Sequence, residues 1–192
     1  MKKIGIAGTT VFCAILVFLA TGVTAHAKEG PYLGIQVPFN KINGDFDNIK
    51  ATAVKGGTGL GLIAGYGFTP TVSLELDLAG TGHRSGDANV RFREFSLNGK
   101  YAFEASPHVQ PFVFLGVGSF TLGNDSVTYG GRGYNVGLGM DYYSSPHLSW
   151  GVALIGKIIR YDRVVKGTKP ASAPDKLNGE TTSLRLDATY HF

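Results

Sequence analysis

The C-terminal segment Thr182–Phe192 alternates between two kinds of residue. One set of alternate positions is mainly apolar and ends in Tyr190 and Phe192, whereas the positions between are polar or charged. Strict period-two alternation predicts a β-strand with one apolar and one polar face. At about eleven residues, the segment is long enough to cross a bilayer at a tilt. We therefore interpret it as a membrane-spanning strand with aromatic residues at a membrane–water boundary.

The same alternation recurs upstream and predicts seven further strands, in which apolar positions alternate with glycine, small polar or charged residues. At Arg93–Glu94 the alternation slips, which predicts either a β-bulge or the point where that strand leaves the membrane. The eight predicted strands cover residues 31–39, 58–68, 72–78, 94–103, 109–122, 134–142, 148–158 and 182–192.

Short and long connections alternate between the predicted strands. Pro70, Pro107 and Pro146 each lie in a short turn, and the intervals between them are 37 and 39 residues. Longer polar loops are predicted at about residues 40–57, 80–89, 123–131 and 162–180. This layout is typical of outer-membrane barrels, which have short periplasmic turns and longer external loops.

The bulk of the apolar face decides which side points outward. A water-soluble lipocalin-type barrel would place its bulky apolar residues inside and its polar residues outside. Here the face opposite the bulky residues is small or charged, so the apolar face is expected to contact lipid. The sequence predicts an all-β fold: an eight-stranded antiparallel up-and-down transmembrane β-barrel, whose lumen is just wide enough for side chains to fill.

The first 27 residues have the pattern of a cleaved signal peptide. Lys2 and Lys3 precede an apolar run, and Ala25-His26-Ala27 supplies a small-x-small cleavage site. A retained membrane helix is the alternative, because the apolar run approaches the length of a span. We expect a signal peptide at 1–27 and a single barrel domain at 28–192.

Cleavage would leave a chain without cysteine, because Cys13 lies in the apolar run. Disulfides and thiolate metal sites are then excluded. Removal of Lys2 and Lys3 leaves 16 basic and 14 acidic residues, a net charge of +2, so no nucleic-acid footprint is present. No cofactor or metal is expected.

Three segments carry a family resemblance: Gln110–Gly118, Val136–Tyr142 and the terminal Tyr190-His-Phe192. The chain resembles the outer-membrane β-barrel domain superfamily, close to the small OmpA/OmpX-type barrels. The resemblance implies a monomer in the cell outer membrane, in contact with outer-membrane lipid and lipopolysaccharide. It also implies partners in the barrel assembly machinery and periplasmic chaperones, with Tyr190 and Phe192 as a terminal assembly signal.

Charged residues on the predicted inner face form the first candidate site. Because isolated buried charges are very costly, they must pair or hold water. They would form either a salt-bridge plug that seals the barrel or a gated polar path for water or small ions. The set comprises Glu75, Asp77, Glu94, Lys100, Asp141, Lys157, Arg185 and Asp187.

Arginines near the predicted long loops form the second candidate site. The guanidinium fork matches the geometry of phosphate, so these residues could contact lipopolysaccharide; otherwise they form a solvated charged rim. The set comprises Arg84, Arg91, Arg93, Arg132, Arg160 and Arg163.

Catalysis has little support in the sequence. His108 and His147 lie two residues after Ser106 and Ser145, but both pairs flank proline in short turns without a positioned acid. We therefore expect no enzyme and no catalytic residue. The expected role is envelope integrity or surface interaction through the external loops. The alternatives are a porin-like channel for small or hydrophobic solutes and, third, a lipid A-modifying barrel enzyme.

Overall fold

The computed structural model describes residues 29–46, 49–50, 56–85, 88–103, 106, 108–124, 126–166, 169–171 and 177–192. The predicted signal peptide and Pro107 lie outside these residues. Within the described ranges, no helix is long and apolar enough to cross a membrane.

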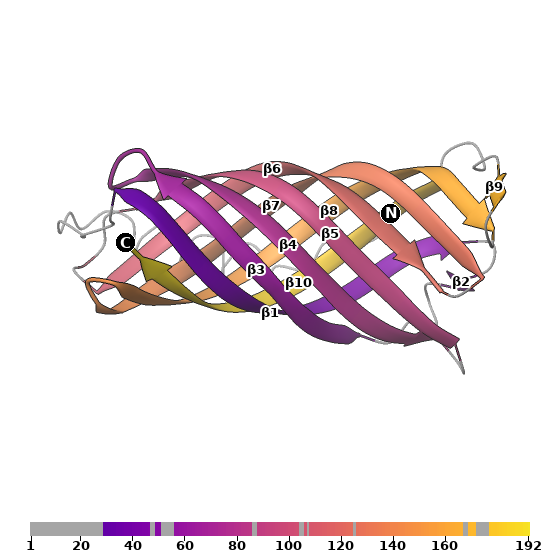
Figure 1. Cartoon of the computed structure of the whole chain (residues 1–192), viewed down its shortest axis with the longest axis horizontal. Coiled ribbons are helices and arrows are strands. Elements are labelled where there is room, and N and C mark those ends of the chain that lie inside the picture. The colour runs from indigo at the N-terminus through magenta and orange to yellow at the C-terminus, as the bar shows by residue number, and fades with distance from the viewer. Residues whose placement is uncertain are drawn as a thin grey trace, which may run out of the picture.

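The described chain forms a closed antiparallel barrel of eight long strands (Figure 1). Each long strand pairs with its neighbours in the sequence, and β10 pairs with both β1 and β8, so the sheet has no free edge across the membrane. The all-β, eight-stranded prediction is confirmed. The long strands are β1 (Gly30–Phe46), β3 (Gly57–Gly67), β4 (Val72–Ser85), β5 (Ala88–Ala102), β6 (Val109–Gly123), β7 (Val127–Ser145), β8 (Leu148–Lys166) and β10 (Leu177–His191).

Several strands are longer than the sequence predicted. Segments 80–89 and 123–131 were expected to be loops, but β4 and β5 stay paired as far as Ser85 and Ala88, and β7 already begins at Val127. Two short strands, β2 (Ile49–Lys50) and β9 (Lys169–Ala171), extend β1 and β8 where only loops were expected. Glycine-rich and polar composition suggested turns there, yet antiparallel pairing satisfies the backbone of these segments despite their weak strand propensity.

Of the two alternatives predicted at Arg93–Glu94, the bulge is absent, because β5 keeps an unbroken register with β4 and β6 through both residues. The residue type on each face changes instead: Phe92 is buried inside the barrel, whereas Arg91 and Arg93 are exposed outside. Register shifts occur between β7 and β8, at Gly130/Gly131 and Tyr143/Ser145.

The outer wall carries an apolar band bounded by aromatic residues near the short turns. Tyr66–Phe68, Tyr101–Phe103 and Tyr190–Phe192 form ring pairs with centroids 5.1–5.3 Å apart. On β7 the band runs from Tyr142 to Arg132. The ten steps between these residues, at about 3.4 Å each along a strand tilted by about 40°, rise about 25 Å, which matches the apolar height of outer-membrane barrels.

The interior changes character along the barrel. Near the short turns it is mainly polar and charged, as predicted, with a small apolar cluster that includes Phe112 and Phe114, whereas towards the long loops it contains a packed apolar core. The prediction of a small or polar inner face throughout is therefore wrong at this end. Apolar residues inside and arginines outside are the arrangement of a water-soluble barrel, so this end extends beyond the lipid. The core comprises Ile42, Val90, Phe92, Phe120, Leu122, Val127, Tyr129, Ile159, Tyr161, Val164 and Leu177.

Candidate functional site

Arg185 is the centre of the charged lumen. This side chain is only 1% exposed, and strand alternation on β10 directs it inward between Leu184 and Leu186. Its Nη1 donates to Glu75 Oε1 at 2.8 Å and to Asp77 Oδ1 at 3.3 Å. Its Nε lies 3.0 Å from Asp187 Oδ1. One buried guanidinium thus compensates three carboxylates on two strands, β4 and β10.

Lys100 joins a fourth carboxylate to this cluster. Its Nζ donates to Asp141 Oδ2 at 2.7 Å and lies 3.8 Å from Glu75 Oε2. Tyr32 also donates to Glu75, at 3.4 Å. Glu75 therefore bridges Arg185 and Lys100, and the network links strands β1, β4, β5, β7 and β10 across the barrel.

Neutral amides complete the coordination of Asp77. Asn98 Nδ2 donates to Asp77 Oδ2 at 2.6 Å, and Gln36 Nε2 donates to Asp77 Oδ1 at 3.1 Å. Asn135 Nδ2 in turn donates to Asn98 Oδ1 at 2.7 Å. Hydrogen bonds from several strands offset the cost of burying this carboxylate.

Lys157 and Glu94 form a second ion pair, separate from the Arg185 cluster. Both side chains are buried, and Lys157 Nζ lies 5.7 Å from the ring centroid of Phe92. Phe92 belongs to the apolar core and stacks on Phe120 with centroids 6.0 Å apart. The pair thus lies where the polar lumen meets the apolar core.

Aromatic rings inside the lumen near the short turns were not predicted from the sequence. Lys100 Nζ lies 3.9 Å above the ring of Phe112, and Arg185 Cζ lies 5.5 Å from that of Phe114. Phe112 and Phe114 are directly opposite Gly139 and Gly137 on β7, where an added Cβ would collide with each ring. Bulky inward residues facing glycines were a signal in the sequence, but using it requires the strand register.

All eight predicted lumen residues lie inside the barrel, and each has an opposite charge nearby. A polar cavity of about 30 Å³ remains at the short-turn end, beside Lys100, Asp141 and His191. It has room for a few water molecules at most. Further towards the loops, the interior holds the Lys157–Glu94 pair, the apolar core and a hydrogen-bonded polar cluster of Asn40, Thr81, His83 and Ser183.

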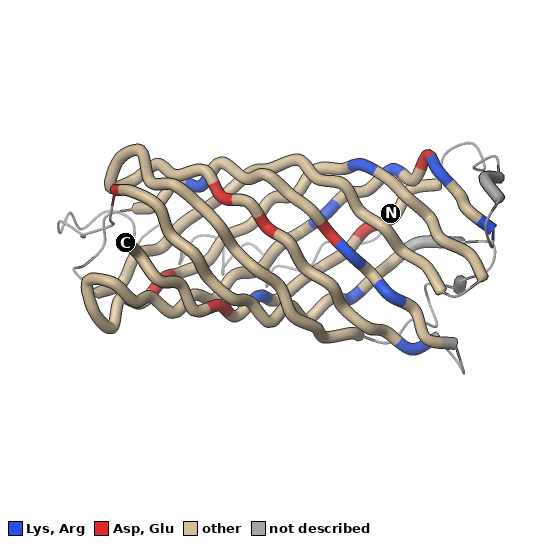
Figure 2. The backbone as a smooth tube through the Cα atoms, viewed as in Figure 1, with Lys and Arg blue, Asp and Glu red and all other residues tan. Residues whose placement is uncertain are grey.

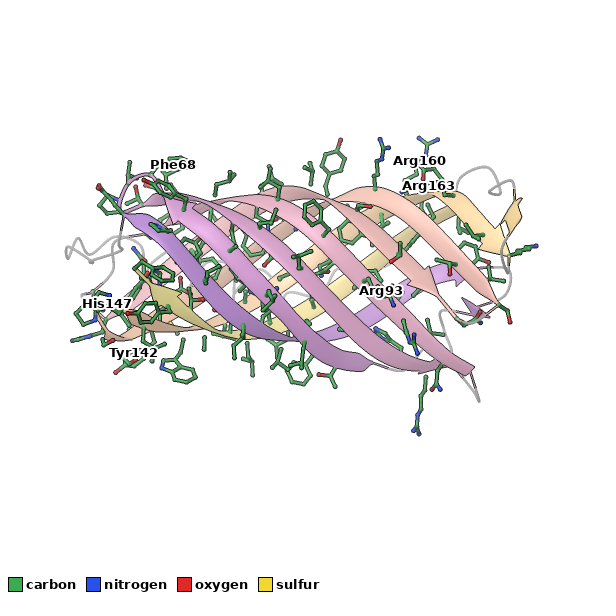
Figure 3. The ribbon with its side chains drawn as sticks, in the orientation of Figure 1. Phe68, Arg93, Tyr142, His147, Arg160 and Arg163 are labelled. Atoms are coloured by element: carbon green, nitrogen blue, oxygen red, sulfur yellow. The ribbon has the colours of Figure 1, made fainter. Side chains whose placement is uncertain are left out.

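The six predicted arginines all lie outside the apolar core, and all are exposed. Figure 3 shows Arg93, Arg160 and Arg163 towards the end of the barrel opposite Phe68, Tyr142 and His147. In Figure 2, most lysines and arginines are gathered in this half of the barrel. Arg132 and Arg160 are direct cross-strand partners on β7 and β8. The Nε atom of Arg163 lies 3.5 Å from Oδ1 of Asp162.

The serine–histidine pairs in the short turns have structural contacts. Ser106 Oγ accepts a hydrogen bond from the backbone N–H of Val109, and Ser145 Oγ accepts bonds from those of His147 and Leu148. These contacts stabilise the two turns. A serine and a histidine do meet inside the barrel, where Ser149 Oγ lies 2.9 Å from His191 Nε2, a pair that the sequence did not single out. At the adjacent end of β10, Tyr190 and Phe192 are exposed on the outer wall.

A closed barrel with an apolar outer band, a charged lumen and an aromatic boundary defines an outer-membrane β-barrel protein. The sequence from 11 to 192 matches the model of the outer membrane protein beta-barrel domain, and the chain belongs to this family. Its location in the outer membrane agrees with the prediction from the sequence. The chain matches no curated protein.

Three solved structures with this fold are similar to the chain at low sequence identity. Neisserial surface protein A is 14% identical, with a TM-score of 0.68, over 85% of this chain and 98% of its own. OprG from Pseudomonas aeruginosa is 19% identical, with a TM-score of 0.55, over 86% and 97%. Ail of Yersinia pestis is 16% identical, with a TM-score of 0.55, over 86% and 100%. At these identities the likeness concerns the fold.

Proposed function

We propose that the protein is a sealed, non-enzymatic barrel that supports the outer membrane and makes surface contacts through its loop end. The observation that carries this proposal is the side-chain packing inside the barrel, where a paired charge network is followed by an apolar core. Such an interior stabilises one closed barrel and leaves the exposed loop end as the surface available for interaction. Loops on a rigid scaffold commonly carry binding specificity.

Contact with lipopolysaccharide is the interaction that the arginines favour. Arg93, Arg132 and Arg160 are exposed near the upper limit of the apolar band and, within the described chain, form no ion pair with a carboxylate. Guanidinium groups at this level face the headgroup region, where phosphates would supply the missing negative charge.

Charge reversal tests this contact. Lipopolysaccharide that co-purifies with the barrel should decrease in the Arg93→Glu/Arg160→Glu variant. The matched control is Lys166→Glu, which reverses a positive charge in the same way at the tip of β8 and should leave the amount of co-purified lipopolysaccharide unchanged. If co-purified lipopolysaccharide is unchanged in the double variant, the proposed contact is wrong.

The exposed Tyr190 and Phe192 rings fit the role of a terminal assembly signal. Their centroids are 5.2 Å apart and both rings lie on the outer wall, where an assembly partner can reach them. Phe192→Ser should slow insertion into the outer membrane. The circular dichroism spectrum of the refolded variant should be the same as that of the wild type.

A channel for small or hydrophobic solutes is the second candidate function, and the polar lumen at the short-turn end of the barrel favours it. Liposome swelling with small neutral solutes distinguishes it from the sealed barrel. The sealed barrel predicts swelling at the rate of empty liposomes, whereas faster swelling would favour the channel.

A further inference from the structure

A groove of about 890 Å³ lies on the outer wall where β5, β6 and β7 approach the arginine level. It follows from side-chain size in register: Ser119 lies between Phe95 and Arg132, and Val117 lies between Leu97 and Tyr134. Small residues on β6 between large residues on both neighbours leave an open furrow along this strand. Because the wall around it is apolar, hydrocarbon can fill the furrow from the surrounding lipid.

Two arginines border the loop-side end of this groove. Arg132 and Arg160 are direct partners across β7 and β8, and both side chains point outward. Like charges placed directly opposite each other destabilise a sheet. Asp162 also lines the groove, but within the described chain its ion pair is with Arg163. The arginine pair is therefore left with an unbalanced positive charge beside an apolar furrow.

We propose that this groove binds one phosphorylated, acylated lipid of the outer leaflet. An acyl chain lies along Val117 and Ser119, and a phosphate of the same molecule is held by Arg132 and Arg160. The guanidinium pair can offer a phosphate several charge-assisted hydrogen bonds in the required fork geometry. The inference rests on the proposed lipopolysaccharide contact and assigns it to one site among the six arginines.

The outer wall supplies internal comparisons. A groove of about 650 Å³ beside Leu60 and Leu78 has only Arg93 at its border, and one of about 460 Å³ beside Leu33 and Leu76 has no basic residue. Both should accept hydrocarbon without selecting for phosphate. Of these three grooves, only the β5–β8 groove combines an apolar furrow with two arginines.

The test is lipid binding by the refolded full barrel, measured by native mass spectrometry in detergent with lipid A as the probe. The wild type should bind one lipid A tightly. Arg132→Gln/Arg160→Gln should weaken this binding by about tenfold or more, the loss expected from charge-assisted hydrogen bonds. Ser119→Phe, which fills the furrow and leaves both arginines, should weaken it similarly. Leu62→Phe, which fills the neighbouring groove beside Leu60 and Leu78, is the matched control and should bind as the wild type does.

Two further probes distinguish a bound lipid phosphate from bound free phosphate. Dephosphorylated lipid A should bind more weakly than lipid A, and inorganic phosphate at millimolar concentration should not displace lipid A. If phosphate alone competes, the acyl part of the inference is wrong.

The failure modes are separable. If Arg93→Gln weakens binding while the Arg132/Arg160 and Ser119 variants do not, lipopolysaccharide contact stands and the groove assignment fails. If none of these variants changes binding, both proposals fail. Heat-dependent gel mobility confirms that each variant is a folded barrel before its binding is compared.

Discussion

Lys157 and Glu94 form a buried ion pair at the level where the charged lumen meets the apolar core. On one side lie the carboxylates and amides around Arg185, and on the other lie the stacked rings of Phe92 and Phe120. The pair therefore lies between two parts of the barrel. In one part the interior is charged, which suits a wall that faces lipid. In the other part the interior is apolar, which suits a wall that faces water.

Breaking the Lys157–Glu94 pair should destabilise the barrel strongly. Lys157→Met leaves Glu94 as an uncompensated buried carboxylate, which typically costs about 3–5 kcal/mol. In the Glu94→Gln/Lys157→Met variant both charges are gone, so most of the loss should be recovered. Denaturant titration in lipid vesicles gives the free energy of unfolding. Equal losses in the single and double variants would show that the charge pair is not the source of the effect.

The apolar core should contribute stability as the core of a soluble protein does. Phe120→Ala should lower the free energy of unfolding by about 3–5 kcal/mol, because it removes buried contacts and leaves a cavity. Leu115→Ala on the lipid-facing wall is the matched control and should cost less, since lipid can fill the space. The same vesicle titration measures both, and similar losses would argue against a packed core.

The glycines opposite the lumen rings should tolerate no side chain. An added Cβ at Gly137 would collide with the Phe114 ring, so Gly137→Ala should cost about 1–3 kcal/mol through overpacking. Gly156→Ala is the control, because the nearest atom to its added Cβ is 3.9 Å away, at Val136. Thermal unfolding monitored by gel mobility compares the two variants. A stable Gly137→Ala barrel would contradict the close contact.

The upper limit of the lipid can be mapped along β7 by introducing arginine. Val136→Arg lies within the apolar band and should destabilise by about 2–4 kcal/mol, whereas Thr128→Arg lies above Arg132 and should cost about 0–1 kcal/mol. Vesicle unfolding titrations measure both. A large penalty at Thr128 would place the lipid boundary closer to the loops than the arginine level indicates.

Sequence alternation was sufficient to predict which residues form the lipid-facing wall and which charged residues lie in the lumen. Glu75, between Leu74 and Leu76, can point only to the face opposite two leucines, so its inward direction follows from period two alone. The same reasoning applied to Arg185 between two leucines. The strand count followed because each apolar alternation was bounded by turn residues.

The apolar core was missed because alternation does not say which face meets water. At Phe92 and Arg93 the apolar and polar faces exchange, and the sequence shows this only as an apparent slip. Interpreting it requires knowing where the lipid ends. The Arg132–Arg160 pair was missed for another reason: cross-strand partners depend on register and barrel stagger, which no single strand encodes.

The central claim is that the lumen is closed, and single-channel recording of the refolded barrel in a planar bilayer tests it most directly. The wild type should show no discrete openings across the voltage range that the bilayer tolerates. Glu75→Gln and Lys100→Met, which alter the charge network but leave the apolar core, should also be silent. Discrete openings in the wild type, altered by either substitution, would show that the lumen charges line a conducting path and would contradict the sealed barrel.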